Sequence, residues 1–271
     1  MAAWLSLLCT VDDLVERKAP QTVRQVLRES VSILKDGGER LDSEPALLAT
    51  CLRDKGLCWH TEDFLDRAQL TSKIRQVSQT FYSHVRPLLS ESTYSSFSEA
   101  ICNVWTGLVL EADLRQDTVP TVDTYMDMRS RTIGLAPFFA LLADCTLSEH
   151  HSKSDALAAL EHSVSIIVGL QNDLLGLEKD LDMGEVMNFV VVVSGGQIQG
   201  GTKTAKMEAG QSAIKKAIAA HNSFVEIAIQ QWNLLRNSST HHAELSPGNE
   251  LIAFIERHLV WSNTTERYQA V

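Results

Sequence analysis

The stretch Asn172-Asp-Leu-Leu-Gly-Leu-Glu-Lys-Asp180 decides the interpretation of this chain, because polar or small residues recur in it every four positions. In an α-helix that spacing places Asn172, Gly176 and Asp180 on one face, one turn apart, with Lys179 beside them. Amide and carboxylate oxygens are hard ligands that suit Mg²⁺, and a neighbouring cation suits a phosphate bound to the same ion. The segment therefore predicts part of a metal and phosphate site on a helix.

Another acidic segment, Asp12-Asp13-Leu-Val-Glu16, lies far upstream. Asp12 and Glu16 are one helical turn apart and project together, with Asp13 beside them. Clustered carboxylates repel one another, and a bound divalent cation relieves that repulsion, whereas the alternative is a solvated acidic helix end. The apolar residues that share the helix face of Asp12 favour the rim of an apolar cavity, and they are Met1, Leu5, Leu8 and Cys9.

The rest of the chain has a helical pattern almost throughout, which predicts an all-α fold in a single domain over residues 1–271. The helices are expected over 2–16, 21–36, 44–56, 60–85, 92–116, 120–145, 154–182, 185–194, 203–236 and 247–262. Gly37 and Gly38 are expected to end one of them. Only the apolar run 187–193 has strand-like composition, and a run of that length cannot be distinguished from a buried helical turn.

Composition excludes several classes of protein. A formal net charge of -10 argues against nucleic acid as a partner, because phosphate backbones attract basic surfaces. Five scattered cysteines with no CxxC pair indicate reduced thiols and a cytoplasmic protein. The apolar first residues lack the basic start of a signal peptide, and no apolar run is long enough to span a membrane.

Basic residues form a third group. The segment Arg129-Ser-Arg-Thr-Ile-Gly134 interrupts an otherwise apolar helix, and Pro137 removes a hydrogen bond there and frees a backbone carbonyl. A free carbonyl beside an arginine is suited to contact a ligand. Near the end of the chain, Trp261 is followed by Arg267 and Tyr268. The alternative for each arginine is an ordinary surface salt bridge.

Together these segments resemble a class I terpene synthase, in the same order along the chain. That family has an aspartate-rich motif on one helix and an Asn/Ser/Glu metal triad on another. The positions that match the first motif are Asp12, Asp13 and Glu16. The positions that match the triad are Asn172, Gly176 and Asp180, with Lys179 matching its accompanying lysine.

The resemblance extends to the residues that handle diphosphate in the family. Arg129 matches the diphosphate sensor, Thr132 the linker that follows it, and Ile133 the effector whose carbonyl lies at the helix break. Arg267 and Tyr268 match the Arg-Tyr pair that closes the chain. The resemblance implies that Arg129, Ile133, Arg267 and Tyr268 take part in catalysis, and that Lys179 joins the two arginines and Tyr268 in binding diphosphate.

The family further implies an all-helical barrel around an apolar cavity, with three Mg²⁺ ions and a prenyl diphosphate substrate. The implied activity is that of a carbon–oxygen lyase, which ionises the substrate, most simply farnesyl diphosphate, and cyclises the carbocation to a terpene. Residue type and spacing suggest five residues for the cavity wall, and they are Leu5, Trp105, Phe138, Phe139 and Trp261.

The chain departs from the family pattern at three points. Gly176 replaces a residue with a metal-binding hydroxyl, and Asp180 is one methylene shorter than the usual glutamate. Only eleven residues precede Asp12, where family members carry several helices. A fold without those helices would expose an apolar patch, which favours self-association into a homodimer.

Three functions therefore stay open. The complete set of charged residues favours an active Mg²⁺-dependent cyclase. The short segment before Asp12 and the glycine at position 176 favour an inactive or truncated homologue that binds prenyl diphosphate or a protein partner. A chain-elongating prenyltransferase would share the fold but would require a second aspartate-rich motif, which the sequence lacks.

Overall fold

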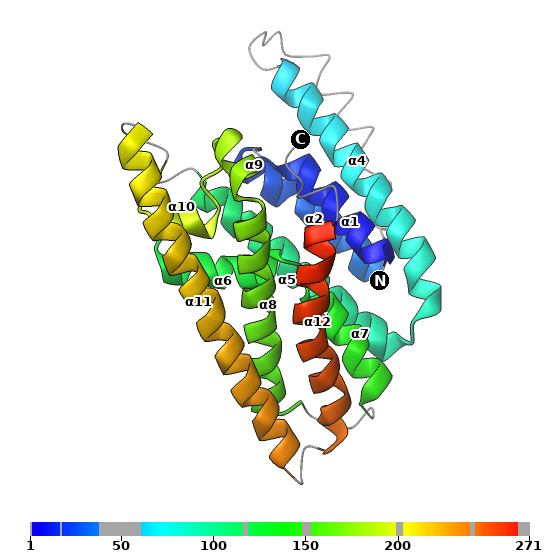
Figure 1. Ribbon diagram of the computed structural model, residues 1–271. Coiled ribbons are helices and arrows are strands. Elements are labelled where there is room, and N and C mark those ends of the chain that lie inside the picture. The colour runs from blue at the N-terminus through cyan, green and yellow to red at the C-terminus, as the bar shows by residue number, and fades with distance from the viewer. Residues whose placement is uncertain are drawn as a thin grey trace. The chain divides into compact units, whose positions relative to one another are not determined.

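A computed structural model describes residues 2–16, 18–37, 61–115, 119–147, 153–198, 203–238 and 242–264 (Figure 1). Every regular element in these ranges is helical, which confirms the all-α expectation. The chain divides into two compact units, Met1–Ala112 and Asp113–Val271, and each is described by itself. The expectation of a single domain stays a prediction. The helix expected over 44–56 lies outside the described residues.

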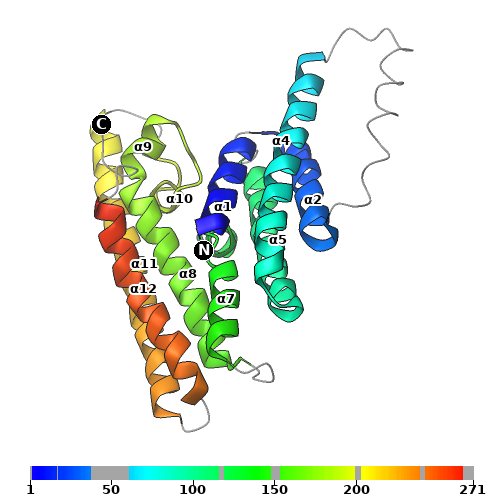
Figure 2. The same cartoon turned by 90° about the vertical axis from the view of Figure 1, so that its right-hand side faces the viewer.

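Among the residues that the structure describes, the first unit holds four long helices and one short turn. They are α1 (Ala2–Val15), α2 (Pro20–Asp36), α4 (Thr61–Val85), the 3₁₀ turn η1 (Arg86–Leu88) and α5 (Glu91–Leu114), whose last residues continue into the second unit. Helix α4 packs along both α1 and α2 (Figure 2).

The bounds of α2 follow from its terminal residues. Pro20 stands at its start, where the missing N–H of proline costs no helical hydrogen bond. Gly37 ends the helix in the left-handed region, with φ 71°, and its N–H donates to the carbonyl of Ile33 at 2.9 Å. The positive φ favours glycine, and an added Cβ would also stand only 3.2 Å from the hydroxyl oxygen of Tyr82.

The core of the first unit holds a buried polar cluster among its aromatic residues. Trp4 and Trp105 are each 1% exposed, and their rings lie 5.7 Å apart between centroids. The indole N–H of Trp105 donates to the hydroxyl of Ser30 at 3.1 Å. The hydroxyl of Ser78 donates to the same oxygen at 2.8 Å. One serine therefore satisfies two buried donors from two other helices.

The second unit is also helical. Its elements are α6 (Val122–Thr132), α7 (Ala136–Thr146), α8 (Asp155–Leu175), α9 (Leu177–Asp182), α10 (Phe189–Val193), α11 (Lys203–Asn237), the 3₁₀ turn η2 (His242–Glu244) and α12 (Leu245–Thr264). Within the described ranges no helix is both long and apolar enough to cross a membrane.

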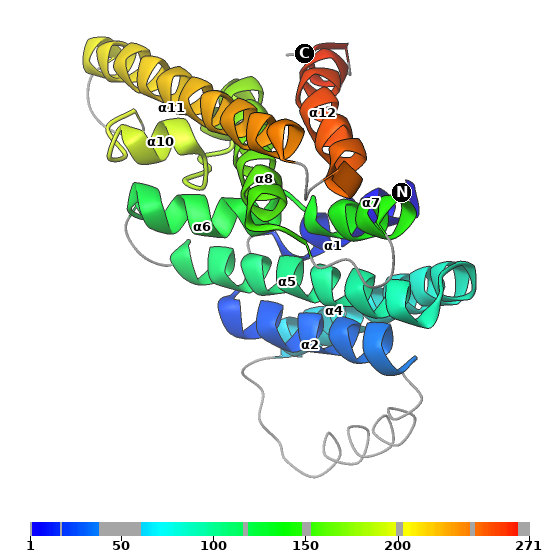
Figure 3. The same ribbon diagram turned by 90° about the horizontal axis from the view of Figure 1, so that it is seen from below.

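Helix α8 is the centre of this unit. It packs against α6, α7, α11 and α12, and Figure 3 shows it between α11 and α6. All nine residues from 163 to 171 are buried, so the helix has no solvent-facing side over that stretch. Leu160, Val164 and Ile167 on this helix pack with Ala228 and Leu235 of α11. The apolar core and the polar end of α8 are thus parts of one element.

Two expected helices are each divided in the structure. The expected helix 120–145 ends at Thr132 and restarts at Ala136, because Gly134 adopts φ 75° and Pro137 cannot donate a hydrogen bond. The expected helix 154–182 breaks at Gly176 into α8 and α9. The run with strand-like composition contains α10, whose first N–H groups are capped by Asn188.

The polar cluster of the first unit predicts a cost for one small substitution. Ser30→Ala removes the acceptor of two buried donors, at about 1–3 kcal/mol for each group left unsatisfied. Ser96→Ala makes the same change on the exposed face of α5 and should cost less than about 0.5 kcal/mol. Urea unfolding followed by circular dichroism measures both variants, and equal midpoints would contradict the assignment.

Candidate functional site

The residues that the sequence singles out fall into two groups, one in each unit. Asp12, Asp13 and Glu16 belong to the first unit, and the segments around Arg129 and Asn172 belong to the second. Arg267 and Tyr268 lie outside the described residues, so their expected roles stay predictions.

The acidic motif occupies the end of α1. The backbone N–H of Glu16 donates to the carbonyl of Asp12 at 2.8 Å, so the two residues lie one helical turn apart as expected. Both are half-buried, whereas Asp13 is exposed. The buried side of α1 carries Trp4, Leu7, Val11 and Val15. Asp12 and Glu16 therefore lie at the border of that side rather than on the fully exposed face.

The second motif, which is the triad Asn172, Gly176 and Asp180, keeps a helical register across the break at Gly176. The N–H of Gly176 donates to the carbonyl of Asn172 at 2.8 Å, and the N–H of Asp180 donates to the carbonyl of Gly176 at 2.9 Å. Asn172, Gly176 and Asp180 are all half-buried, and Lys179 is exposed. The spacing of one turn that the sequence predicts is therefore present in α8 and α9.

The arginine segment is built as a helix end. Arg129 lies in the last turn of α6, and the N–H of Ile133 donates to its carbonyl at 3.1 Å. Gly134 and Pro137 then prevent the helix from continuing. The residue four positions after Ile133 is Pro137, which has no N–H, so the carbonyl of Ile133 lacks its helical donor. The expected helix break with a freed carbonyl is present.

Asp173 is a buried residue of the candidate site that sequence reasoning missed. It is 2% exposed, and its Oδ1 accepts from Nη2 of Arg129 at 2.7 Å. Its Oδ2 accepts from the hydroxyl of Tyr125 at 2.5 Å and from the N–H of Phe189 at 3.2 Å. Burial raises the pKa of the Asp173 carboxyl, and the charge of Arg129 and these hydrogen bonds oppose that rise. The carboxylate thus joins α6, α8 and α10.

A glycine gives Arg129 the space for this contact. A Cβ at Gly169 would stand 3.0 Å from Cγ of Arg129, closer than side chains normally approach. Gly169 and Asp173 are one turn apart on α8, so the stem of the arginine crosses the glycine and its guanidinium reaches the carboxylate. The space left by the missing side chain at position 169 is therefore filled by the side chain of Arg129.

Asn188 links the two ends of the second motif. It is fully buried, and its Nδ2 donates to the backbone carbonyl of Asp173 and to Oδ2 of Asp180, both at 2.8 Å. Its Oδ1 accepts from the N–H of Val190 at 2.9 Å, which caps α10. The side-chain amide therefore has both donors and its acceptor in use.

A chain of side-chain hydrogen bonds runs from Gln171 to α11 and α12. Nδ1 of His258 lies 2.8 Å from Oε1 of Gln171, and Nε2 of Gln171 lies 3.3 Å from Nε2 of His221. Nδ1 of His221 in turn lies 3.1 Å from Oδ1 of Asn222. With a proton on Nδ1, His258 donates to Oε1 of Gln171, and the amide of Gln171 donates to Nε2 of His221. Gln171 is thereby fixed next to Asn172.

The five residues expected in the cavity wall have different environments. Trp105 belongs to the core of the first unit through Trp4 and Ser30. Phe139 is 8% exposed and Phe138 partly buried in the apolar cluster around α8. Leu5 is 49% exposed, and Trp261 is 51% exposed with its ring 5.9 Å from that of His258. Their roles in a cavity stay predictions.

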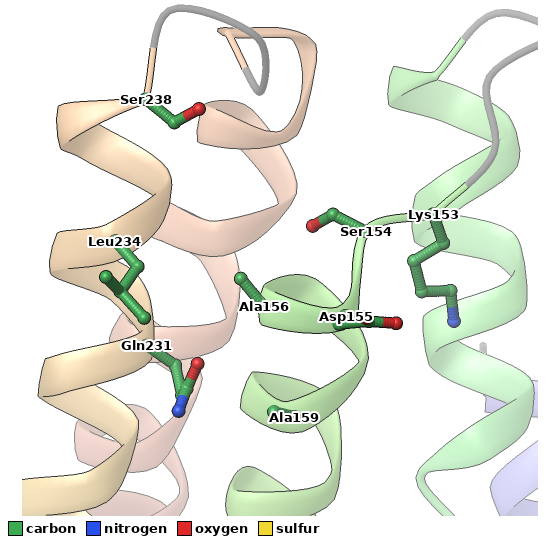
Figure 4. Close-up of a pocket in the computed structure, with 8 residues that line it drawn as sticks. All are labelled: Lys153, Ser154, Asp155, Ala156, Ala159, Gln231, Leu234 and Ser238. Atoms are coloured by element: carbon green, nitrogen blue, oxygen red, sulfur yellow. The ribbon is translucent and has the colours of Figure 1, made fainter.

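A surface pocket of about 810 Å³ lies at the opposite end of α8 (Figure 4). Its walls come from the start of α8 and the last turns of α11, including Ser154, Asp155 and Leu234. The backbone N–H of Ser154 donates to the buried carboxylate of Glu244 at 2.7 Å, so the start of α8 already has a negative partner. No residue that the sequence singles out lines this pocket.

The second motif has the donor chemistry for a hard cation, although only two of its residues carry a side-chain oxygen. Asn172 and Asp180 supply oxygen donors, whereas Gly176 supplies none from a side chain. A Cβ at Gly176 would stand 3.6 Å from Oδ2 of Asp180. In the part of the chain that the structure describes, no three histidine, cysteine, aspartate or glutamate side chains gather as metal ligands do. The residues fit Mg²⁺ with water in the remaining positions.

Comparison with known proteins gives the family. The profile described as "Terpene synthase family 2, C-terminal metal binding" matches residues 3–197, which include both acidic motifs and the arginine segment. The chain belongs to the terpene synthase family, and the expected resemblance is confirmed.

Curated relatives carry names from the same family. The chain is 21% identical over 218 residues to silphinene synthase of Penicillium patulum, covering 76% of this chain and 55% of that protein. It is 28% identical over 131 residues to (+)-germacrene D synthase of Selaginella moellendorffii, covering 46% of this chain and 37% of that protein. The chain therefore spans about half or less of these relatives' length.

A solved structure supports the fold. The crystal structure of linalool/nerolidol synthase from Streptomyces clavuligerus superposes with a TM-score of 0.55 and 16% identity. The superposition covers 96% of this chain and 79% of that one. The expected all-α class I terpenoid synthase fold is confirmed.

The ion pair between Arg129 and Asp173 predicts a large effect of Asp173→Ala on stability. The variant removes the acceptor of the Arg129 guanidinium, whose side chain is 16% exposed, and of a buried phenol, and breaking a buried pair costs about 3–5 kcal/mol. Asp127→Ala is the matched control, because it breaks an ion pair with Arg131 in which the Asp127 side chain is 57% exposed, worth about 0–1 kcal/mol. Similar small losses in urea unfolding of both variants would argue against the buried pair.

The histidine chain predicts a pH dependence. Burial lowers the pKa of His258 from 6.5 to about 4, so at intermediate pH the unfolded chain binds a proton that the folded chain excludes. This contribution to stability is present above pH 6.5 and is lost as the pH falls toward 4.

The corresponding test compares urea midpoints across that range in three proteins. His258→Gln should lose less stability on acidification than the wild type, because glutamine does not titrate. His162→Gln, on the exposed side of α8, should follow the wild-type profile. Parallel profiles for the wild type and His258→Gln would refute the assignment.

Proposed function

We propose that this chain is a Mg²⁺-dependent terpene cyclase that ionises a linear prenyl diphosphate and cyclises the resulting carbocation. The observation that carries the proposal is the hydrogen-bonded ion pair between Arg129 and Asp173. A buried carboxylate directly after Asn172 holds the arginine that matches the family's diphosphate sensor. A relative from Cyclocybe aegerita is named a sesquiterpene synthase, and that name supports a C15 substrate, farnesyl diphosphate.

In the proposed reaction the allylic carbon–oxygen bond of the substrate breaks, and its electron pair leaves with the diphosphate. The allyl cation is then attacked by a double bond of the same chain, and cyclisation ends by loss of a proton or capture of water. Mg²⁺, when bound, would supply Lewis-acid stabilisation of the leaving diphosphate. Asn172 and Asp180 would hold such an ion in the second unit, and Asp12, Asp13 and Glu16 match the family's other metal-binding motif. We follow the family in proposing three ions.

The residues of the chain have separate tasks in this proposal. Arg129 binds diphosphate through guanidinium hydrogen bonds while Asp173 fixes its orientation, which is the preorganisation that electrostatic catalysis needs. Lys179, Arg267 and Tyr268 add positive charge and donors for the same anion. The carbonyl of Ile133 supplies a negative dipole next to the sensor. The aromatic rings of Phe138 and Phe139 are proposed as cavity wall for the carbocation.

A second candidate function is favoured by Gly176. Because that position offers no side-chain oxygen, metal binding in the second unit depends on two protein ligands and water. A chain that binds prenyl diphosphate without turnover would retain Arg129 and Asp173 and still lack activity. Self-association through exposed apolar side chains, such as Val260 at 58% and Trp261 at 51% exposure, is also proposed.

The cyclase is tested by incubating the purified chain with farnesyl diphosphate, with and without Mg²⁺, followed by gas chromatography–mass spectrometry. A cyclic hydrocarbon or alcohol that depends on Mg²⁺ is the expected product. The C10 and C20 diphosphates, run in parallel, report the substrate length. A folded chain that binds diphosphate but gives no product from any of the three would favour the second candidate.

Loss of a residue that hydrogen-bonds to a metal ligand costs ~10–100-fold in activity. Asn172 is proposed as a ligand itself, so Asn172→Ala should lower turnover by at least that factor. Asp12→Ala should act in the same way, because each variant removes a proposed ligand. Asn233→Ala on the exposed face of α11 is the control and should retain wild-type turnover. Normal activity in Asn172→Ala or Asp12→Ala, with an unchanged circular dichroism signal, would remove that residue from the metal site.

A further inference from the structure

The amide of Asn188 has more hydrogen bonds than a helix cap requires. Capping α10 needs only its Oδ1, which accepts from the N–H of Val190 at 2.9 Å. Serine, threonine or aspartate would serve equally well at such a position. The Nδ2 group of Asn188 donates instead to Asp180 and to the backbone of Asp173. The choice of an amide therefore has a reason outside α10.

That reason lies in the carboxylate of Asp180. Its Oδ2 accepts from Nδ2 of Asn188 at 2.8 Å. In the part of the chain that the structure describes, Oδ1 of Asp180 accepts no hydrogen bond. An aspartate at position 188 would set a second negative oxygen against Asp180, and a serine would be too short to reach it. An amide is the cap that also binds a carboxylate.

The same amide joins Asp180 to the ion pair. Asp173 holds Arg129 through its side chain, and its backbone carbonyl accepts from Asn188. Asn188 is fully buried, so these hydrogen bonds form without competition from solvent. The carboxylate of Asp180 is thereby fixed relative to the end of α8, although it lies beyond the helix break at Gly176.

We propose that Asn188 is a positioning residue for Asp180: its amide holds one carboxylate oxygen and leaves the other for a divalent cation. The inference rests on the proposed function, because it takes Asp180 as a metal ligand. It adds a residue outside the metal motif, eight positions further along the chain. A fixed carboxylate also offsets the shorter reach of aspartate, because less conformational freedom is lost when a cation binds.

The test measures binding of Mn²⁺, as a probe for the divalent site, to the whole chain with inorganic pyrophosphate, by electron paramagnetic resonance of the free ion. Asn188→Ser keeps a good helix cap and removes both Nδ2 hydrogen bonds. It should weaken Mn²⁺ binding by about 10–100-fold, as loss of an outer-sphere partner does. Thr121→Ala, which removes the side-chain cap of α6, is the control and should leave Mn²⁺ binding unchanged.

A double-mutant cycle separates positioning from a general loss of structure. If Asn188 acts through Asp180, then Asn188→Ser should weaken Mn²⁺ binding no further in an Asp180→Ala background. An equal effect in both backgrounds would overturn the proposal.

Two other outcomes also decide the matter. If Asp180→Ala weakens Mn²⁺ binding and Asn188→Ser does not, the positioning role fails while the proposed metal site stands. If the folded wild-type chain does not bind Mn²⁺, or if Asp180→Ala binds Mn²⁺ as tightly as the wild type, both the positioning role and the ligand assignment fail.

Discussion

The second unit depends on one buried ion pair, between Arg129 of α6 and Asp173 of α8. A carboxylate that is 2% exposed is costly to bury, and only its full set of donors makes that burial tolerable. The donors come from Arg129, Tyr125 and Phe189, so forming the pair requires α6, α8 and the start of α10 to be in place together. The geometry of the site therefore depends on how α6, α8 and α10 pack together.

The polar end of α8 differs from its apolar middle in what it demands of neighbouring helices. Leu160, Val164 and Ile167 require only apolar neighbours of suitable volume. Gln171 and Asp173 require particular atoms at hydrogen-bonding distance, from His258 and His221 in one case and from Arg129 and Tyr125 in the other. Asn172 stands between two residues that are fixed on different sides, which limits its own freedom without any contact to a ligand.

How much the sequence predicts depends on whether a feature is local. Proline and glycine act on their own turn, so the helix break after Arg129 was predictable, and the regular spacing of Asn172, Gly176 and Asp180 survives in the structure. Asp173 was missed although it stands in the quoted segment, because its partner Arg129 lies 44 positions away and spacing does not connect them. Asn188 was missed because an asparagine before an apolar run is explained by capping alone. In both cases a charged or amide group adjoining buried residues was the available signal.

The close contact of Arg129 with Gly169 also restricts how this unit is able to move. The stem of the arginine crosses α8 at a position without a side chain, and its guanidinium is bound one turn further along. Sliding α6 along α8 by a turn would bring the arginine against a Cβ and separate it from Asp173. The contact and the ion pair therefore oppose shear between these two helices, whereas hinge rotation at interruptions such as Gly134 and Gly176 is the other class of movement open to helical proteins.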